Sequence, residues 1–219
     1  MAGSSPHLNL WKQNLRQVPE YVWERTETES LVLADNGLAE ISEKIGRLQR
    51  LRMLDLGHNQ LTQVPEALGE IEELSDFLYL HDNRLKELPQ SLGRLKKLRY
   101  LNISENRFRE LPPAACEMTG LVELRISDNQ LTSLPDAIRG LGRLRELHLR
   151  NNRLRSLPKS VGALRELRQL DLRGNPLIEL PEEIADLPRL EKLDLRWVNT
   201  LPRIGWLEQL EARGCLVYR

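Results

Sequence analysis

The sequence predicts an α/β solenoid, a fold in which one short unit is stacked on itself along a single axis. The first observation is a recurring asparagine whose successive copies are separated by 23, 24, 23, 23, 23 and 23 residues. These copies are Asn36, Asn59, Asn83, Asn106, Asn129, Asn152 and Asn175. The second observation is the segment before each asparagine, where apolar and polar residues alternate, as in Leu147, His148 and Leu149. A fixed period of this length, with one strand-like segment per copy, is typical of a stacked repeat.

The alternating segment predicts a short β-strand in every copy. One strand cannot bury its own apolar side, so the copies are expected to stack into a parallel sheet over a continuous leucine core. Extending the period to both ends gives about nine strands. After each strand the chain turns toward the core, which leaves backbone amides and carbonyls away from water. A carboxamide both donates and accepts hydrogen bonds, so Asn152 and its equivalents are predicted to satisfy these groups.

The other side of each copy is predicted to form a short helical or 3-10 turn. A proline suits the first turn of a helix, where no backbone donor is required. The prolines at this position are Pro19, Pro65, Pro89, Pro112, Pro135, Pro158 and Pro181. In the second copy Ser42 takes this place and is expected to cap the turn. A glycine four residues later, at positions 46, 69, 93 and 162, is expected to allow close packing or the turn toward the next strand.

The whole chain, residues 1–219, is predicted to be a single domain. Residues 5–27 read as a degraded capping repeat in which Ser5 replaces the first leucine, residues 28–198 as regular copies, and residues 199–219 as a C-terminal cap. The cap is expected to contain a short helix and then an apolar run at 215–218 that covers the last strand edge. The fourth copy has one extra residue between Leu74 and Phe77, which predicts a bulge and leaves the direction of Phe77 open.

Composition excludes several classes of partner. Lys plus Arg and Asp plus Glu both number 32, so net charge favours neither a nucleic acid nor a membrane surface. The N-terminal residues lack the basic and apolar pattern of a signal peptide, and no stretch is long and apolar enough to span a bilayer. Only Cys116 and Cys215 occur, on distant copies. We therefore expect a monomer in the reducing cytoplasm, without a cofactor.

Alternate strand residues face opposite sides of a sheet, so positions 3, 5, 7 and 8 of each copy are expected on the concave face. Over the third to fifth copies these positions hold Met53, His58, Phe77, Tyr79, His81 and Tyr100. Aromatic residues, Met and His on an exposed face predict a protein-contact hot spot. Ordinary cross-strand packing is the alternative.

Charged residues also fall on the concave positions. A basic line at the C-terminal end is formed by Arg150, Arg173 and Arg196, with Arg125 beside it, and an acidic line by Asp35, Asp82, Glu105 and Asp128. His148 also lies on a concave position, and we predict that it, like the four arginines, contacts the partner. Segregated charge could orient a partner, and a solvated surface is the alternative.

All four histidines fall on concave positions, and histidine is a residue type of both metal sites and catalytic sites. His58 and His81 lie on neighbouring copies, but no set of three or four ligands is evident, and we predict no metal site. A hydrolytic pair of His81 and Ser104 lacks an evident oxyanion hole. No catalytic residue is predicted.

The copies resemble a known family in sequence segments such as LRMLDLGHNQLTQVPEALGEI and LRQLDLRGNPLIELPEEIADL. The consensus LxxLxxLxLxxNxLxxLPxxLGxL is similar to intracellular leucine-rich-repeat proteins, a class that includes Ras-suppressor and Scribble-type scaffolds, plant Ras-group-related proteins, Roco-protein repeats and bacterial repeat effectors. The resemblance covers about residues 8–195. It implies a horseshoe whose concave parallel sheet binds proteins.

These observations together predict a non-catalytic protein–protein interaction module, a scaffold in cytoplasmic signalling, with its partner on the concave face. The alternative is a secreted effector or specificity module that acts on a host or companion signalling protein. An enzyme would need a deep pocket or a bound metal ion.

Overall fold

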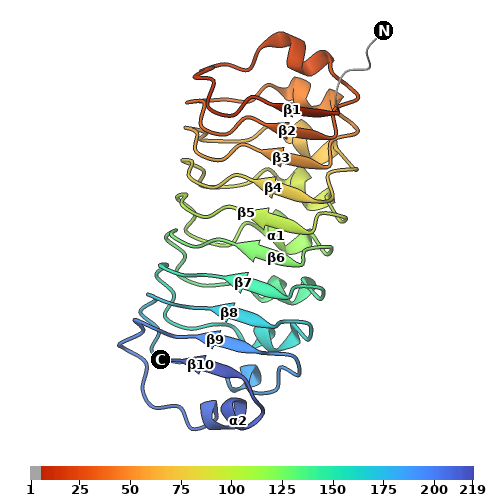
Figure 1. The fold of residues 1–219 in the computed structure, drawn as a ribbon. Coiled ribbons are helices and arrows are strands. Elements are labelled where there is room, and N and C mark those ends of the chain that lie inside the picture. The colour runs from red at the N-terminus through yellow and green to blue at the C-terminus, as the bar shows by residue number, and fades with distance from the viewer. Residues whose placement is uncertain (1–5) are drawn as a thin grey trace.

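A computed structural model describes residues 6–219 and confirms the solenoid. Its ten strands within that range form one open parallel sheet in sequence order (Figure 1). The strands are β1 (His7–Asn9), β2 (Ser30–Val32), β3 (Met53–Asp55), β4 (Phe77–Tyr79), β5 (Tyr100–Asn102), β6 (Glu123–Arg125), β7 (Glu146–His148), β8 (Gln169–Asp171), β9 (Lys192–Asp194) and β10 (Leu216–Tyr218). Ser5, the first residue of the predicted capping repeat, lies outside the described residues.

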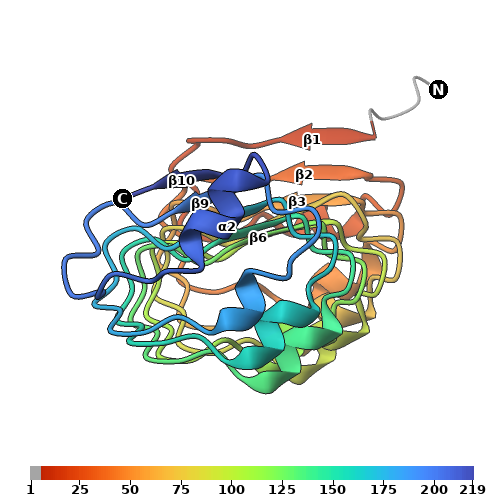
Figure 2. The same ribbon diagram turned by 90° about the horizontal axis from the view of Figure 1, so that it is seen from below.

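Short helices form the layer opposite the sheet (Figure 2). They are the 3-10 turns η1 (Glu20–Glu24), η2 (Glu43–Arg47), η3 (Glu66–Glu70), η4 (Gln90–Arg94), η5 (Asp136–Gly140), η6 (Lys159–Ala163) and η7 (Glu182–Ile184), and the α-helix α1 (Pro113–Glu117). The second α-helix, α2 (Leu207–Ala212), lies instead at the C-terminal end of the stack, beyond β10 (Figure 1). The repeated prolines precede the turns as N-caps, and Ser42 accepts a 3.2 Å hydrogen bond from the Lys44 amide, as predicted. Within residues 6–219 no helix is long and apolar enough to cross a membrane.

The asparagines form a ladder between the layers. Asn152 is typical: its Oδ1 accepts from the Leu131 amide at 3.0 Å, and its Nδ2 donates to the carbonyls of Ile126 at 2.9 Å and Leu149 at 3.0 Å. One side chain therefore bonds to backbone groups of its own copy and of the preceding copy. The predicted role of the carboxamide is confirmed.

The repeated glycines pack against the next turn. A Cβ added to Gly69 would lie 2.3 Å from the backbone of Ser91 in η4, and one added to Gly162 would lie 2.6 Å from the Glu183 side chain. Close packing, rather than a left-handed turn, explains glycine at these positions.

The extra residue of the fourth copy lies before β4. Leu74 keeps the backbone bond that Leu51 makes in the preceding copy, and Phe77 pairs in register with Met53 and Tyr100. The chain absorbs the insertion around Ser75, so Phe77 lies on the concave face, which answers the question that the sequence left open.

The C-terminal segment differs from expectation in one respect. Its apolar run forms a tenth strand, because Leu216 to Tyr218 pair in parallel register with Lys192 to Asp194. Leu207 and Leu210 of α2 are buried against the core. The prediction of about nine strands therefore missed β10.

Candidate protein-binding surface

The concave face is formed by the strand residues that flank a buried leucine. In β2 to β9 the central residue is always a leucine, and its exposed fraction is at most 1%. The flanking residues are on the opposite face, since successive side chains alternate. The residues that the sequence placed in these concave columns thus lie side by side in register.

Three rings form what we call the aromatic cluster: Phe77, Tyr79 and Tyr100. Ring centroids are 5.9 Å apart for Phe77 and Tyr79, 5.5 Å for Phe77 and Tyr100, and 5.0 Å for Tyr79 and Tyr100. Phe77 is 43% exposed, and the two tyrosines are half-buried. Met53 lies next to Phe77 on β3. The structure therefore brings together the apolar residues that the sequence selected.

The local environment favours uncharged tyrosines. Burial raises the pKa of Tyr100 to about 12, and burial also raises the pKa of Tyr79. The Arg125 guanidinium lies 5.9 Å from the centre of the Tyr100 ring. The cluster thus offers apolar ring faces, hydroxyl groups and one cation, the residue types that are enriched in protein-contact hot spots.

A pocket of about 280 Å³ adjoins this cluster. It is lined by Asp76, Phe77, Arg99, Tyr100, Val122 and Glu123. Two aromatic side chains and one valine form its apolar part, and charged groups surround it. Its volume is below that of typical small-molecule sites, and it is suited to a single side chain of a partner.

The two predicted histidines beside the cluster contact each other. The Nε2 atoms of His58 and His81 are 3.2 Å apart, and His58 Nδ1 lies 2.7 Å from Asp82 Oδ2. Burial, followed by the neighbouring His58, lowers the pKa of His81. His81 also contacts Tyr79, with 6.0 Å between ring centroids, so the pair extends the aromatic cluster.

The predicted basic line consists of paired arginines. Arg173 Nε donates to Asp171 Oδ1 at 2.8 Å, and Arg196 Nη2 donates to Asp194 Oδ2 at 2.7 Å. Burial alone would raise the pKa of Asp194, but the hydrogen bonds from Arg196 outweigh it and the pKa is lowered. These arginines are therefore neutralised locally.

The remaining predicted charges in the centre of the sheet also have partners. Arg150 Nη2 bonds to Asp128 Oδ2 at 3.1 Å, and Arg125 pairs with Glu123. His148 Nε2 lies 3.2 Å from Glu146 Oε2. This part of the concave face is a network of ion pairs.

The acidic line has a backbone explanation that the sequence did not reveal. Position 8 of every copy has positive φ, from +48° at Asp82 to +67° at Gly174. Asn, Asp and Gly tolerate this left-handed conformation best. Asp35, Asp82, Asp128 and Asn151 therefore suit the turn, whereas Lys12, Glu105 and Trp197 adopt it without such a preference.

A second aromatic group was missed by sequence reasoning. Trp197 is 63% exposed, with Arg173 and Arg196 at 6.0 Å and 5.8 Å from its ring. Arg196 also lies 5.2 Å from the Tyr218 ring of β10. The sequence signal was available, because Trp197 is an aromatic residue at position 8 of the ninth copy, but it was assigned no role.

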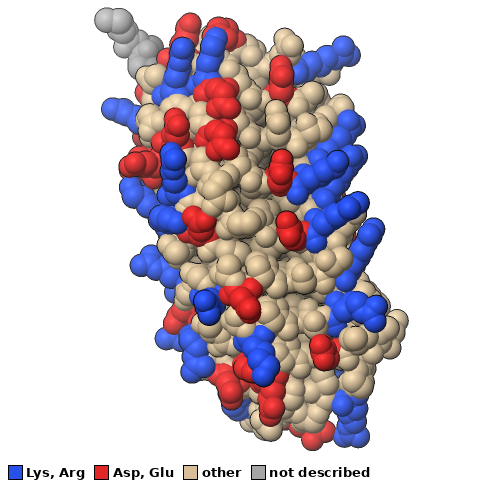
Figure 3. Space-filling view, turned by 180° about the vertical axis from the view of Figure 1, so that it is seen from behind, with Lys and Arg blue, Asp and Glu red and all other residues tan. Residues whose placement is uncertain are grey.

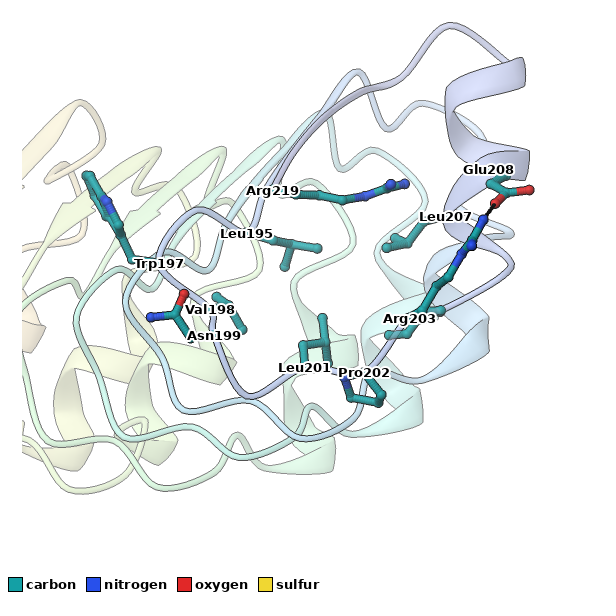
Figure 4. Close-up of a pocket in the computed structure, with 11 residues that line it drawn as sticks. Leu195, Trp197, Val198, Asn199, Leu201, Pro202, Arg203, Leu207, Glu208 and Arg219 are labelled. Carbon is teal, nitrogen blue, oxygen red and sulfur yellow. Dashed lines mark hydrogen bonds and ion pairs between the residues drawn. The ribbon is translucent and has the colours of Figure 1, made fainter.

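Trp197 also borders a pocket of about 260 Å³ at the C-terminal end (Figure 4). Its apolar lining is Leu195, Val198, Leu201, Pro202, Ile204 and Leu207. Arg203 pairs with Glu208 at the border, at 3.0 Å. The pocket is where the core leucines of the last full copy meet the cap.

The face opposite the sheet has a different character. Acidic and basic side chains are interspersed over it, and basic ones gather along one edge (Figure 3). The aromatic contacts described above all involve residues of the concave face or of the strand ends. The candidate protein-binding surface therefore lies on the concave face.

Family models match most of the chain. A model described as leucine rich repeat matches residues 26–85, 76–131 and 97–154, and a leucine-rich repeat region model matches 136–214. The chain belongs to the leucine-rich-repeat family. No curated protein matches the sequence significantly.

Solved leucine-rich-repeat structures resemble this chain throughout its length. The repeat domain of the type III effector XopL is 26% identical with a TM-score of 0.80, and the match covers 99% of this chain and 76% of that one. A repeat protein of Leptospira interrogans is 25% identical with a TM-score of 0.75, and the match covers 95% of this chain and 65% of that one. A third structure is the ectodomain of the receptor kinase GASSHO1/SCHENGEN3 from Arabidopsis thaliana, in complex with CASPARIAN STRIP INTEGRITY FACTOR 2. It is 28% identical with a TM-score of 0.79, and the match covers 92% of this chain and 25% of that one. This chain thus spans less than two thirds of the last two proteins.

Proposed function

We propose that this leucine-rich-repeat chain is a non-catalytic protein-binding module whose partner docks on the concave face at the aromatic cluster. The observation that carries the proposal is the mutual contact of Phe77, Tyr79 and Tyr100 on two adjacent strands, with Phe77 exposed to solvent. Exposed, clustered aromatic residues supply much apolar contact area at a small cost in side-chain entropy. The receptor ectodomain solved with its bound factor supports a protein ligand for this family.

The pocket beside the cluster gives the partner a defined anchor. Phe77 and Tyr100 belong to its apolar lining, and Asp76, Arg99 and Glu123 add charged groups to the lining. We infer that the partner inserts one apolar or aromatic side chain, with hydrogen-bonding groups on either side. The strands are fixed by the repeat stack, so little ordering entropy opposes this contact.

We further propose that the module works as a monomeric scaffold in the cytoplasm, within a signalling assembly. Cys116 and Cys215 are both free and buried, which supports a reducing compartment. Neutral overall charge and the interspersed charges of the face opposite the sheet support a protein partner over a nucleic acid or a membrane.

The test is a double substitution in the cluster. Partners are captured on the wild-type chain and identified by mass spectrometry, and the affinity of a recombinant partner is then measured by calorimetry. Tyr79→Ala with Tyr100→Ala should weaken binding by at least about thirtyfold, since loss of hot-spot side chains costs about 2 kcal/mol or more.

Tyr21→Ala is the matched control, because Tyr21 is an exposed tyrosine of η1, away from the sheet. It should leave the affinity unchanged. Equal affinity of the wild type and the Tyr79 and Tyr100 double variant would place the binding site elsewhere, provided that both melt at similar temperatures.

Similarity to the XopL repeat domain supports a second candidate: an effector or specificity module that acts on a host or companion signalling protein. Capture from two lysates separates the candidates. The scaffold should retain a partner from its own cell, whereas an effector should retain one only from host cells. Loss of either interaction in the Tyr79 and Tyr100 double variant tests whether the same surface is used.

A further inference from the structure

His58 and His81 lie on neighbouring copies with their ring nitrogens facing each other. Their Nε2 atoms are 3.2 Å apart, and their planes meet at 81° with 4.7 Å between centroids. Two imidazoles bound to one tetrahedral zinc ion, each about 2.0–2.1 Å from the metal, have nitrogens about 3.3 Å apart. The observed separation fits a hydrogen bond between the two rings, and it also fits two ligands of one ion.

A carboxylate orients the first ring. Asp82 Oδ2 lies 2.7 Å from His58 Nδ1, so this nitrogen carries the proton and the lone pair is on Nε2. Metal-binding histidines commonly donate their second ring N–H to a carboxylate, which fixes the tautomer and strengthens the ligand. Asp82 thus holds His58 in the state that a metal ion requires.

Two further features belong to this pair. His58 has φ +52°, in the turn that has a positive φ in every copy and that holds Asp, Asn or Gly in five of nine copies: Asp35, Asp82, Asp128, Asn151 and Gly174. In addition, His81 Nδ1 is buried and has no hydrogen-bond partner among residues 6–219.

The His81 ring fits beside residue 57 because that residue is a glycine. Its ring lies against Gly57, and a Cβ on Gly57 would be 2.4 Å from His81 Cε1. The chain therefore has a glycine and an oriented carboxylate around one pair of imidazole nitrogens.

We propose that His58 and His81 bind a divalent transition-metal ion of the class that prefers imidazole, such as Zn²⁺, through their Nε2 atoms, with Asp82 as the orienting group. The ion replaces the proton shared between the two nitrogens, and His81 then carries its proton on Nδ1. Water on the open concave face completes the coordination. The proposal does not depend on the protein-binding function proposed above.

A second group of potential ligands is the best competitor. One ligand atom each of Glu123, Glu146 and His148 lies within 4.8 Å of the others. These groups already have partners, because Arg125 pairs with Glu123, and His148 Nε2 lies 3.2 Å from Glu146 Oε2. A metal ion there would have to displace these partners and approach Arg125, so we assign the site to the histidine pair.

The test is calorimetric titration of the whole chain with ZnCl₂ in a non-coordinating buffer at neutral pH. The wild type should bind one ion saturably. His58→Asn keeps a residue that suits the left-handed turn and removes the ligand, and it should weaken binding at least tenfold. Asp82→Asn also suits the turn and should weaken binding by about ten- to a hundredfold, as loss of an orienting carboxylate does at other sites.

His148→Gln is the control and should bind Zn²⁺ like the wild type. Thermal melts without metal establish that each variant is folded. Absence of saturable binding to the wild type, or unchanged binding by His58→Asn, would overturn the proposal. Loss of binding in His148→Gln with retention in His58→Asn would assign the ion to the glutamate cluster instead.

Discussion

The asparagine ladder gives a prediction whose size can be derived from individual hydrogen bonds. In Asn152→Ala the Leu131 amide loses its only acceptor among the described residues, Asn152 Oδ1 at 3.0 Å. The Ile126 carbonyl keeps only a 3.4 Å bond from Asn129, whereas the Leu149 carbonyl keeps a 2.9 Å bond from Asn175. The damage is therefore one orphaned buried donor and one weakened carbonyl.

An orphaned buried donor costs about 1–3 kcal/mol, and a weakened hydrogen bond costs about 0.5–1 kcal/mol more. We expect Asn152→Ala to lower the free energy of unfolding by about 1.5–4 kcal/mol. Urea denaturation measures this loss, and hydrogen exchange of the Leu131 amide locates it. Thr132→Ala, at an exposed neighbouring residue, should change stability by less than about 0.5 kcal/mol.

Both the urea denaturation and the hydrogen exchange are needed to test the role of the Asn152 carboxamide. A loss below about 1 kcal/mol, together with undiminished protection of the Leu131 amide, would show that another group satisfies this donor. The carboxamide would then not be the reason for asparagine at this position.

Three further predictions concern packing, reactivity and pH. Gly69→Ala should destabilise the chain by about 1–3 kcal/mol in urea, because its Cβ would meet the Ser91 backbone, whereas Gly142→Ala, with open space around it, should not destabilise it through a clash. Cys116 is buried and its pKa is raised to about 11, so at pH 7.5 it should react with a thiol reagent only as the chain unfolds; fast labelling of the native chain would contradict this. The pKa of His81 is lowered from 6.5, so the unfolded chain binds more protons below that pH, and stability should be complete above about pH 6.5 and fall as the pH drops toward the folded pKa. The groups that face His81 are His58, which lowers its pKa further, and Asp55, Asp82 and Glu105, which oppose the shift. His81→Gln should flatten this dependence, and an unchanged slope would exclude His81 as its source.

The fold could be predicted because the period constrains every core position. Leu147 is buried, and Asn152 bonds to the backbone of two copies, for reasons that repeat every 23 residues. The direction of Phe77 could not be predicted, because an insertion of one residue can be absorbed before or within a strand. Pairing with Met53 and Tyr100 decides it.

The candidate surface was predicted in its apolar part and less well in its charged part. Asp171 and Arg173 are two residues apart and point to the same face, so the sequence spacing was compatible with their pairing. The prediction treated positions 5 and 7 as independent and therefore missed it. The conformation of position 8 was not visible, and it explains much of the acidic line. Tyr218 joined the surface only because the C-terminal run forms β10, which no repeat pattern indicates.

The sequence order of the sheet has a mechanical consequence. Each strand is hydrogen-bonded only to its neighbours along the chain, and the termini of the described chain lie at opposite ends of the stack (Figure 1). A force applied to the two ends therefore peels strands from the array one after another and never shears the whole sheet at once. Stretching should give a series of low, similar force peaks, because the repeats unfold one at a time. On relaxation they should refold one at a time in the reverse order.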